Sequence, residues 1–126
     1  MSVTINITKE QRENLLCSAI EGGSNYWYYF NTKSCQAIDN IAPKDGKTPF
    51  VDRLYTALEK GLTVAVQDCD TMKTIGQLSI ESIEKGEQLM ADKYADDFAD
   101  IVADTDDANT ADIWFQLAVI GRVEYC

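Results

Sequence analysis

The sequence predicts a single α+β domain in which a small, mainly antiparallel sheet packs with about four helices. The chain has 126 residues, which suits one domain, so the prediction covers residues 1–126 as one unit. Hydrophobic residues make up 45% of the chain and charged residues 25%, an ordinary globular composition. Strand and helix patterns alternate without the spacing of parallel βαβ units, and this order favours an antiparallel sheet.

The first predicted elements are a strand, a helix and a second strand. Residues 3–7 alternate apolar and polar side chains, which indicates a short half-buried strand. Thr8 and Gln11 form a capping-box pattern for a helix that ends at the glycines of positions 22 and 23. The five consecutive aromatic residues 26–30 predict a strand with two apolar faces, which suits a central position in the sheet. The alternative is that one face stays partly open, at a protein interface or under a stacked base.

The middle of the chain predicts a loop, a helix and a hairpin. Residues 31–47 are mostly polar and contain Pro43, so they indicate a loop. Thr48–Pro49 then favours the start of a helix that Gly61 ends. Residues 62–67 and 74–78 predict two strands joined by a turn.

The last third of the chain predicts helices and a short final strand. Ser79 is expected to cap a helix whose pattern continues through residues 80–102. A turn over 104–109 precedes a helix from about Thr110 to Gly121, and residues 123–125 are predicted to form a strand.

The charge is strongly acidic and unevenly distributed. The net charge is −10, which disfavours direct binding to a nucleic-acid backbone. Residues 1–79 carry nine acids and eight bases, whereas residues 80–126 carry twelve acids and three bases. No apolar run is long enough for a membrane span, and no secretory signal precedes the first elements. We therefore expect a cytoplasmic protein whose four cysteines are free thiols.

The residue types exclude several chemistries. The chain has no histidine, which removes the usual general base and the commonest metal ligand. No phosphate-binding or dinucleotide-binding glycine motif is present. The aspartate-rich segment 104–109 fails the calcium-loop pattern at three positions. The sequence therefore predicts a non-enzymatic protein with no catalytic residues, no metal site and no cofactor.

One candidate site is a row of aspartates that recur every four residues. On a continuous helix these residues would form one stripe. Neighbouring aspartates, Asp112 among them, would widen it. This acidic face is a candidate surface for a basic partner, and the alternative is a solvated face that only confers solubility. The candidate partner-binding residues are Asp92, Asp96, Asp97, Asp100, Asp104, Asp106 and Asp107.

A second candidate is the corner that leads into the aromatic strand. Adjacent glycines allow a close backbone approach, and polar and aromatic side chains follow them. A structural turn is the alternative to a ligand or interface corner. The residues of this corner are Gly22, Gly23, Ser24, Asn25, Tyr26 and Trp27.

The C-terminal block, residues 111–121, is apolar nearly all round. Such a helix is buried either in the core or in a contact between copies of the chain. The sequence leaves both interpretations open, so a homo-oligomer formed through this helix remains an alternative.

Two sequence blocks resemble a group of small phage and prophage proteins of uncharacterised function. The blocks are Glu21–Trp27 and Thr110–Gly121, together with Tyr125 near the end. Members of the group often end in glycine after this tyrosine, whereas this chain has Cys126. The resemblance implies an accessory protein that acts in the cytoplasm of an infected bacterium. It supplies no functional residue.

The leading hypothesis is a phage-encoded inhibitor or adaptor. Its acidic face would bind a basic surface on a host defence protein or nucleic-acid-handling protein, and one hypothesis for the binding mode is imitation of a nucleic acid. One alternative is a protein that sequesters a small ligand or nucleotide at Asn25, Tyr26 and Trp27. A further alternative is a structural or virion-associated oligomer.

Overall fold

The computed structural model describes residues 7–126 and shows an α+β fold with six α-helices and a three-stranded antiparallel sheet. The strand predicted over residues 3–7 lies almost entirely outside the described residues. The α-helices are α1 (Lys9–Ser18), α2 (Thr32–Ile41), α3 (Phe50–Glu59), α4 (Ile80–Lys93), α5 (Ala95–Val102) and α6 (Ala108–Val119). A π-helical turn, η1 (Ala19–Gly23), continues α1, and the strands are β1 (Tyr28–Tyr29), β2 (Val64–Asp68) and β3 (Thr74–Leu78).

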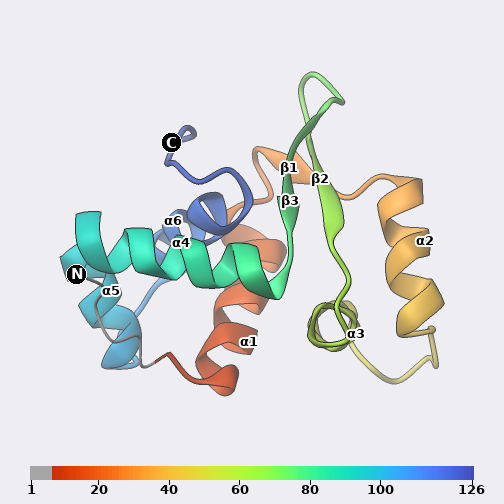
Figure 1. Ribbon diagram of the computed structural model, residues 1–126, viewed down its shortest axis with the longest axis horizontal. Helices are drawn as coiled ribbons and strands as arrows, with labels where there is room; N and C mark the ends of the chain where they lie inside the picture. Colours follow the sequence, from red (N-terminus) through yellow and green to blue (C-terminus); the bar gives the residue numbers. More distant parts are fainter. Residues whose placement is uncertain (1–6) are drawn as a thin grey trace.

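The sheet separates a larger group of helices from α2. Figure 1 shows α1, α4, α5 and α6 on one side of the strands, α2 on the other side, and α3 near one end of the sheet. The hairpin of β2 and β3 projects beyond the helices. Its strands pair as predicted, with Val64 opposite Leu78.

The prediction of a central aromatic strand is wrong. The strand order is β1-β2-β3, so β1 is an edge strand, and it contains only Tyr28 and Tyr29. Trp27 and Tyr28 are both buried, whereas Tyr26 is 44% exposed. Trp27 precedes the strand, because its backbone N–H donates to the Ser24 carbonyl in a turn, so the five aromatic residues do not form one strand.

Residues 32–41 form helix α2, although the sequence predicted a loop there. Asn31 caps this helix by accepting a hydrogen bond from the Ser34 backbone N–H at 2.9 Å. Ile38 is fully buried against the core. The helix is polar on its outer face, which explains why composition alone suggested a loop.

Two predicted helix starts are confirmed by their caps. Thr8 and Gln11 form both hydrogen bonds of a capping box at the start of α1. Ser79 caps α4 through the Ser82 backbone N–H. Helix α6 begins at Ala108, two residues earlier than predicted, because Asp107 caps it.

A buried ion pair links α1 to α4 and α6. The guanidinium of Arg12 donates two hydrogen bonds from Nε and Nη2 to the carboxylate of Glu87, which is fully buried. The indole N–H of Trp114 donates to the same carboxylate at 3.1 Å. Burial would lower the pKa of Arg12, but the hydrogen bond and charge of Glu87 raise it above its usual value.

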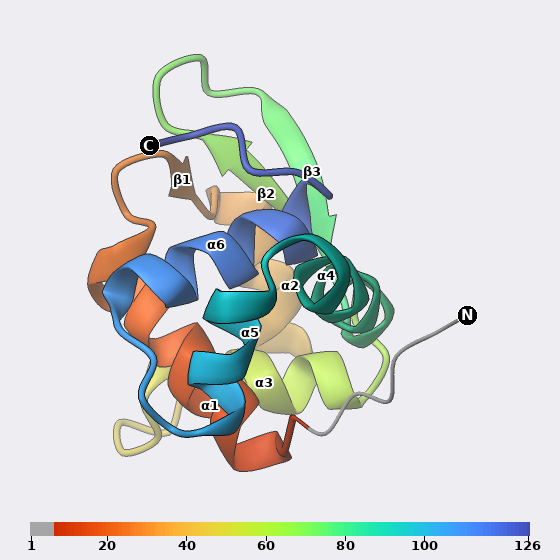
Figure 2. The same cartoon turned by 90° about the vertical axis from the view of Figure 1, so that its left-hand side faces the viewer.

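The C-terminal block lies in the core. Trp114 and Phe115 are at most 1% exposed, and the backbone of α6 at Ala118 lies directly against Gly86 of α4. Residues 123–125 do not form the predicted strand. They follow an irregular path beside α6 (Figure 2).

Candidate functional site

The acidic face does not form one helical stripe, so that prediction is wrong. Tyr94 interrupts the helix, with φ −131° and ψ 53°, and separates α4 from α5. Asp92 lies on α4, Asp96 and Asp100 lie on α5, and Asp104 follows α5 in a left-handed conformation with φ 59°. The four-residue spacing is therefore helical only between Asp96 and Asp100.

Several aspartates of the acidic face have local structural roles that the sequence did not reveal. Asp107 caps α6, and hydrogen bonds from the backbone and hydroxyl of Thr110 hold the pKa of its carboxyl below the usual value. Asp104 accepts a hydrogen bond from the Gln11 amide at 3.0 Å, which ties the end of α5 to α1. Asp100 accepts from the Thr105 hydroxyl at 3.2 Å.

The acidic face carries charge that no neighbouring base neutralises. Within residues 7–126, none of its seven aspartates is in an ion pair. Five of them are exposed, and Asp97 and Asp106 are half-buried. Lys93 is the one basic residue between Asp92 and Asp107 in the sequence. These carboxylates therefore present a strongly negative surface to the solvent.

The glycine-aromatic corner packs on the start of α6. The π-helical turn η1 ends there, and the backbone N–H of Ser24 donates to the Ala19 carbonyl at 2.8 Å. Single π-helical turns are frequent at functional sites. Gly23 lies so close to α6 that a Cβ atom in its place would be 2.6 Å from the Ala108 carbonyl oxygen.

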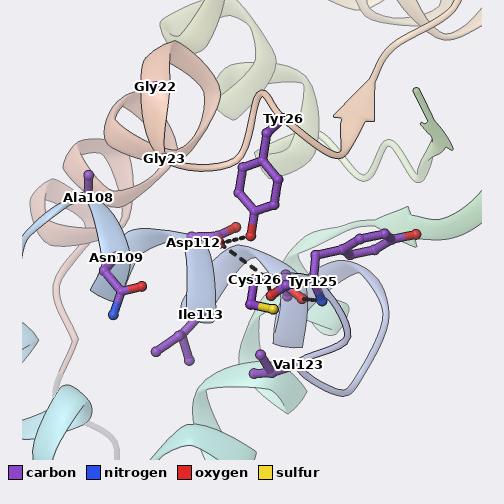
Figure 3. A pocket seen from close by; sticks show the side chains of 11 residues that line it. Gly22, Gly23, Tyr26, Ala108, Asn109, Asp112, Ile113, Val123, Tyr125 and Cys126 are labelled. Carbon is purple, nitrogen blue, oxygen red and sulfur yellow. Dashed lines mark hydrogen bonds between the residues drawn. The ribbon is translucent and has the colours of Figure 1, made fainter. Parts of the chain in front are cut away.

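The buried carboxylate of Asp112 accepts hydrogen bonds from three side chains of the corner. Its Oδ1 accepts from the Ser24 hydroxyl at 2.7 Å and from the Trp27 indole N–H at 2.8 Å. Its Oδ2 accepts from the Tyr26 hydroxyl at 2.6 Å and from the Gln116 amide at 3.1 Å. Figure 3 shows the Tyr26 hydroxyl pointing at this carboxylate. Burial, and then the hydrogen bond to Asp112, raise the pKa of Tyr26.

Sequence reasoning placed Asp112 with the acidic face, but the side chain is only 6% exposed. A single acid within the apolar segment 111–121 was the signal that could have identified it, because a buried charge needs hydrogen-bonding partners. Gln116, which is fully buried one helical turn further on, was missed for the same reason. Asn25 is exposed and does not join the cluster around Asp112.

The C-terminal segment covers the aromatic side of this cluster. Gln116 binds it through three hydrogen bonds, accepting from the backbone N–H groups of Glu124 and Tyr125 and donating to the Tyr125 carbonyl. The ring of Tyr125 stacks on Trp27 with a centroid distance of 5.0 Å and an interplanar angle of 6°. The two sequence blocks and Tyr125 therefore meet in space.

Tyr125 also donates a hydrogen bond from its hydroxyl to Asp68 at 2.6 Å. This bond raises the pKa of Tyr125 to about 12 and lowers the pKa of Asp68. Because the pKa of Tyr125 is raised above its ordinary value of 10.0 and the pKa of Asp68 is lowered from its ordinary value of 3.8, the bond stabilises the fold fully between these two pH values. Its contribution is lost as the pH rises through about 12.

A pocket of about 480 Å³ opens between the corner, α6 and the C-terminal segment. This volume lies within the range of small-molecule sites. Eleven residues line the pocket: Gly22, Gly23, Tyr26, Ala108, Asn109, Asp112, Ile113, Gln116, Val123, Tyr125 and Cys126. Of the six predicted corner residues, three line the pocket: Gly22, Gly23 and Tyr26. Ser24 and Trp27 are buried and do not line it.

Gly23 should tolerate alanine far less well than its neighbour Gly22. A Cβ at Gly23 would meet the Ala108 carbonyl oxygen, whereas a Cβ at Gly22 would meet nothing within 4 Å. We expect Gly23→Ala to lower the free energy of unfolding by about 1–3 kcal/mol through overpacking. Gly22→Ala should leave it unchanged or raise it by up to about 1 kcal/mol. Urea unfolding of both variants checks this, and equal midpoints would show that η1 does not pack on α6 as described.

Other kinds of site receive no support in the described part of the chain. Among residues 7–126, no three Cys, Asp or Glu side chains are grouped as a metal site would require. All four cysteines are free, as predicted. No helix in that range combines the length and apolar character that a membrane span needs.

Comparisons with protein-family models, curated proteins and solved structures found no match to this chain. The resemblance to small phage proteins therefore stays a prediction.

Proposed function

We propose that this chain is a non-enzymatic, phage-encoded accessory protein that binds a basic surface on a host protein through its acidic face. The observation that carries the proposal is the concentration of unpaired carboxylates on α5 and the turns that follow it. Fixed charges of one sign accelerate the encounter with a surface of opposite sign and favour one class of partner.

The exposed side of α5 is suited to a protein partner. Asp96 and Asp100 lie one helical turn apart, and the exposed side chains of Ala99 and Val102 lie next to them. Val102 is 45% exposed and so adds apolar surface next to these carboxylates. A partner could therefore combine ion pairs with a small apolar contact at the same place.

Nucleic-acid imitation in its simplest form is less well supported. That idea depended on evenly spaced aspartates along one helix, and the break at Tyr94 removes the even spacing. The proposal therefore names a basic protein surface, such as one on a defence or nucleic-acid-handling protein, without requiring that a phosphate backbone is copied.

The test uses two double variants with the same change in charge. Asp96→Asn with Asp100→Asn alters the acidic face, and Glu81→Gln with Glu84→Gln alters exposed acids of α4 outside it. Removing the like-charge pair on α5 favours the helix, and removing the acid from its first turn disfavours it. Each effect is below about 1 kcal/mol, so lost binding would not reflect unfolding. Each protein is immobilised and incubated with bacterial host lysate at low and high salt.

We expect the wild type and the α4 variant to retain the same host protein at low salt. The retained amount should fall at least fivefold with the α5 variant, and at least fivefold with the wild type at high salt. Equal retention by the α5 variant, or retention that does not change with salt, would contradict the proposal. Retention of no protein at low salt would also contradict it.

A further inference from the structure

Within residues 7–126, Asp112 is a buried carboxylate without a counter-charge. It is 6% exposed, and its four hydrogen-bond donors are the neutral side chains of Ser24, Tyr26, Trp27 and Gln116. In the described range 7–126 no lysine or arginine forms an ion pair with it. Buried carboxylates are usually paired with a cation, because desolvation of an isolated charge is costly. The contrast within this molecule is Glu87, which is buried and paired with Arg12.

The pocket of about 480 Å³ lies directly beside this carboxylate. Asp112 and Tyr26 both line it (Figure 3). The Tyr26 hydroxyl donates its hydrogen to Asp112, so its oxygen can still act as a hydrogen-bond acceptor. Tyr26 is 44% exposed and lines the pocket, so a ligand in the pocket can contact this residue. The hydroxyl oxygen therefore provides a hydrogen-bond acceptor on the pocket side, next to the Asp112 carboxylate.

The rest of the lining selects against anions. Among the residues of the described chain that line the pocket, none is lysine or arginine. Ile113 and Val123 supply apolar surface, and Asn109 supplies one neutral polar side chain. A nucleotide, the ligand suggested by the sequence, would bring phosphate charge next to Asp112 with no base to neutralise it. A cation with an apolar group matches both the carboxylate and the apolar surface of the pocket.

The site is also organised before any ligand binds. Four hydrogen bonds fix the Asp112 carboxylate, and the fully buried Gln116 holds the C-terminal segment that forms one wall. A ligand would therefore lose little free energy to ordering the site.

We propose that this pocket binds a small organic amine in its protonated form. The ammonium group donates to the Tyr26 hydroxyl next to Asp112, and the apolar part of the molecule contacts Ile113 and Val123. The proposal is independent of the acidic face, since none of the seven aspartates of that face lines the pocket.

The test compares three probes of similar size and different charge: 2-phenylethylamine, 2-phenylethanol and phenylacetate. Each is titrated into the ¹⁵N-labelled protein at neutral pH and followed by amide chemical shifts. We expect the amine to cause saturable shifts at Gly22, Gly23 and Asn109, and to bind at least tenfold more tightly than the alcohol. Phenylacetate should cause no saturable shifts at these residues.

Three variants separate the pocket from general attraction to an acidic protein. Tyr26→Phe should weaken amine binding at least tenfold, and Ile113→Trp should abolish it by filling the pocket. Glu84→Gln removes one exposed charge outside the pocket and should leave the affinity within twofold of the wild type. Equal binding of amine and alcohol would overturn the proposal. Shifts confined to residues 92–107, or no saturable shift with the amine, would overturn it as well.

Discussion

Asp112→Ala is expected to lower the free energy of unfolding by about 3 kcal/mol or more. The substitution leaves the Ser24 hydroxyl and the Trp27 indole N–H buried without their acceptor, and each such donor costs about 1–3 kcal/mol. The Gln116 amide, also fully buried, loses one of its two acceptors. Loss of a buried charge offsets part of this cost, because no cation in residues 7–126 pairs with Asp112.

The measurement is urea unfolding followed by far-ultraviolet circular dichroism, which does not depend on the local surroundings of Trp27. Asp112→Asn keeps one acceptor oxygen and should fall between the wild type and the alanine variant. Asp96→Ala is the control, because Asp96 is exposed, and it should change the free energy by no more than about 0.5 kcal/mol. An Asp112→Ala midpoint equal to that of the wild type would show that the carboxylate does not organise the corner.

Glu87→Ala is expected to lower the free energy of unfolding by about 3–5 kcal/mol, the usual cost of removing one partner from a buried ion pair. The substitution leaves the Arg12 guanidinium without its two hydrogen bonds and the Trp114 indole N–H without an acceptor. It also opens space where α1, α4 and α6 meet. The exposed pair between Glu81 and Lys85 on the same helix provides the comparison.

Lys85→Ala should change the free energy of unfolding by less than about 1 kcal/mol, because solvent screens an exposed ion pair. The double variant Arg12→Met with Glu87→Leu should recover much of the stability lost in Glu87→Ala, because neither buried charge is then left alone. A double variant less stable than Glu87→Ala would show that charge pairing is not the main role of Glu87. Urea unfolding of all four proteins makes the comparison.

Several parts of the fold followed from short-range sequence patterns. The hairpin of β2 and β3 was predicted because alternating strands flank a turn, and the pairing partners are close in sequence. The capping box at Thr8 and the N-cap at Ser79 were predicted because each depends only on residues close in sequence. Burial of the 111–121 segment followed from its lack of a polar face.

The helix breaks at Tyr94 because a straight helix would be longer than the core on which it packs. An unbroken helix over residues 80–102 would extend for about 34 Å, at 1.5 Å per residue, and would carry its last turns past the core. The chain instead folds back at Tyr94, which allows Ile101 to be fully buried. The four-residue spacing of the aspartates is the same whether residues 80–102 form one helix or two. The sequence therefore predicted one stripe of aspartates, whereas the structure has two segments.

The sequence by itself determined the fold class, the acidic charge, the hairpin and the segments that carry both candidate sites. Tertiary structure decided which polar groups meet. Asp112 is the single acid of an apolar segment, but only the approach of η1 and Trp27 to α6 supplies the donors that make it a buried acceptor. The physical reason is that burial and hydrogen bonding across about 85 residues depend on how helices pack, which no local pattern contains.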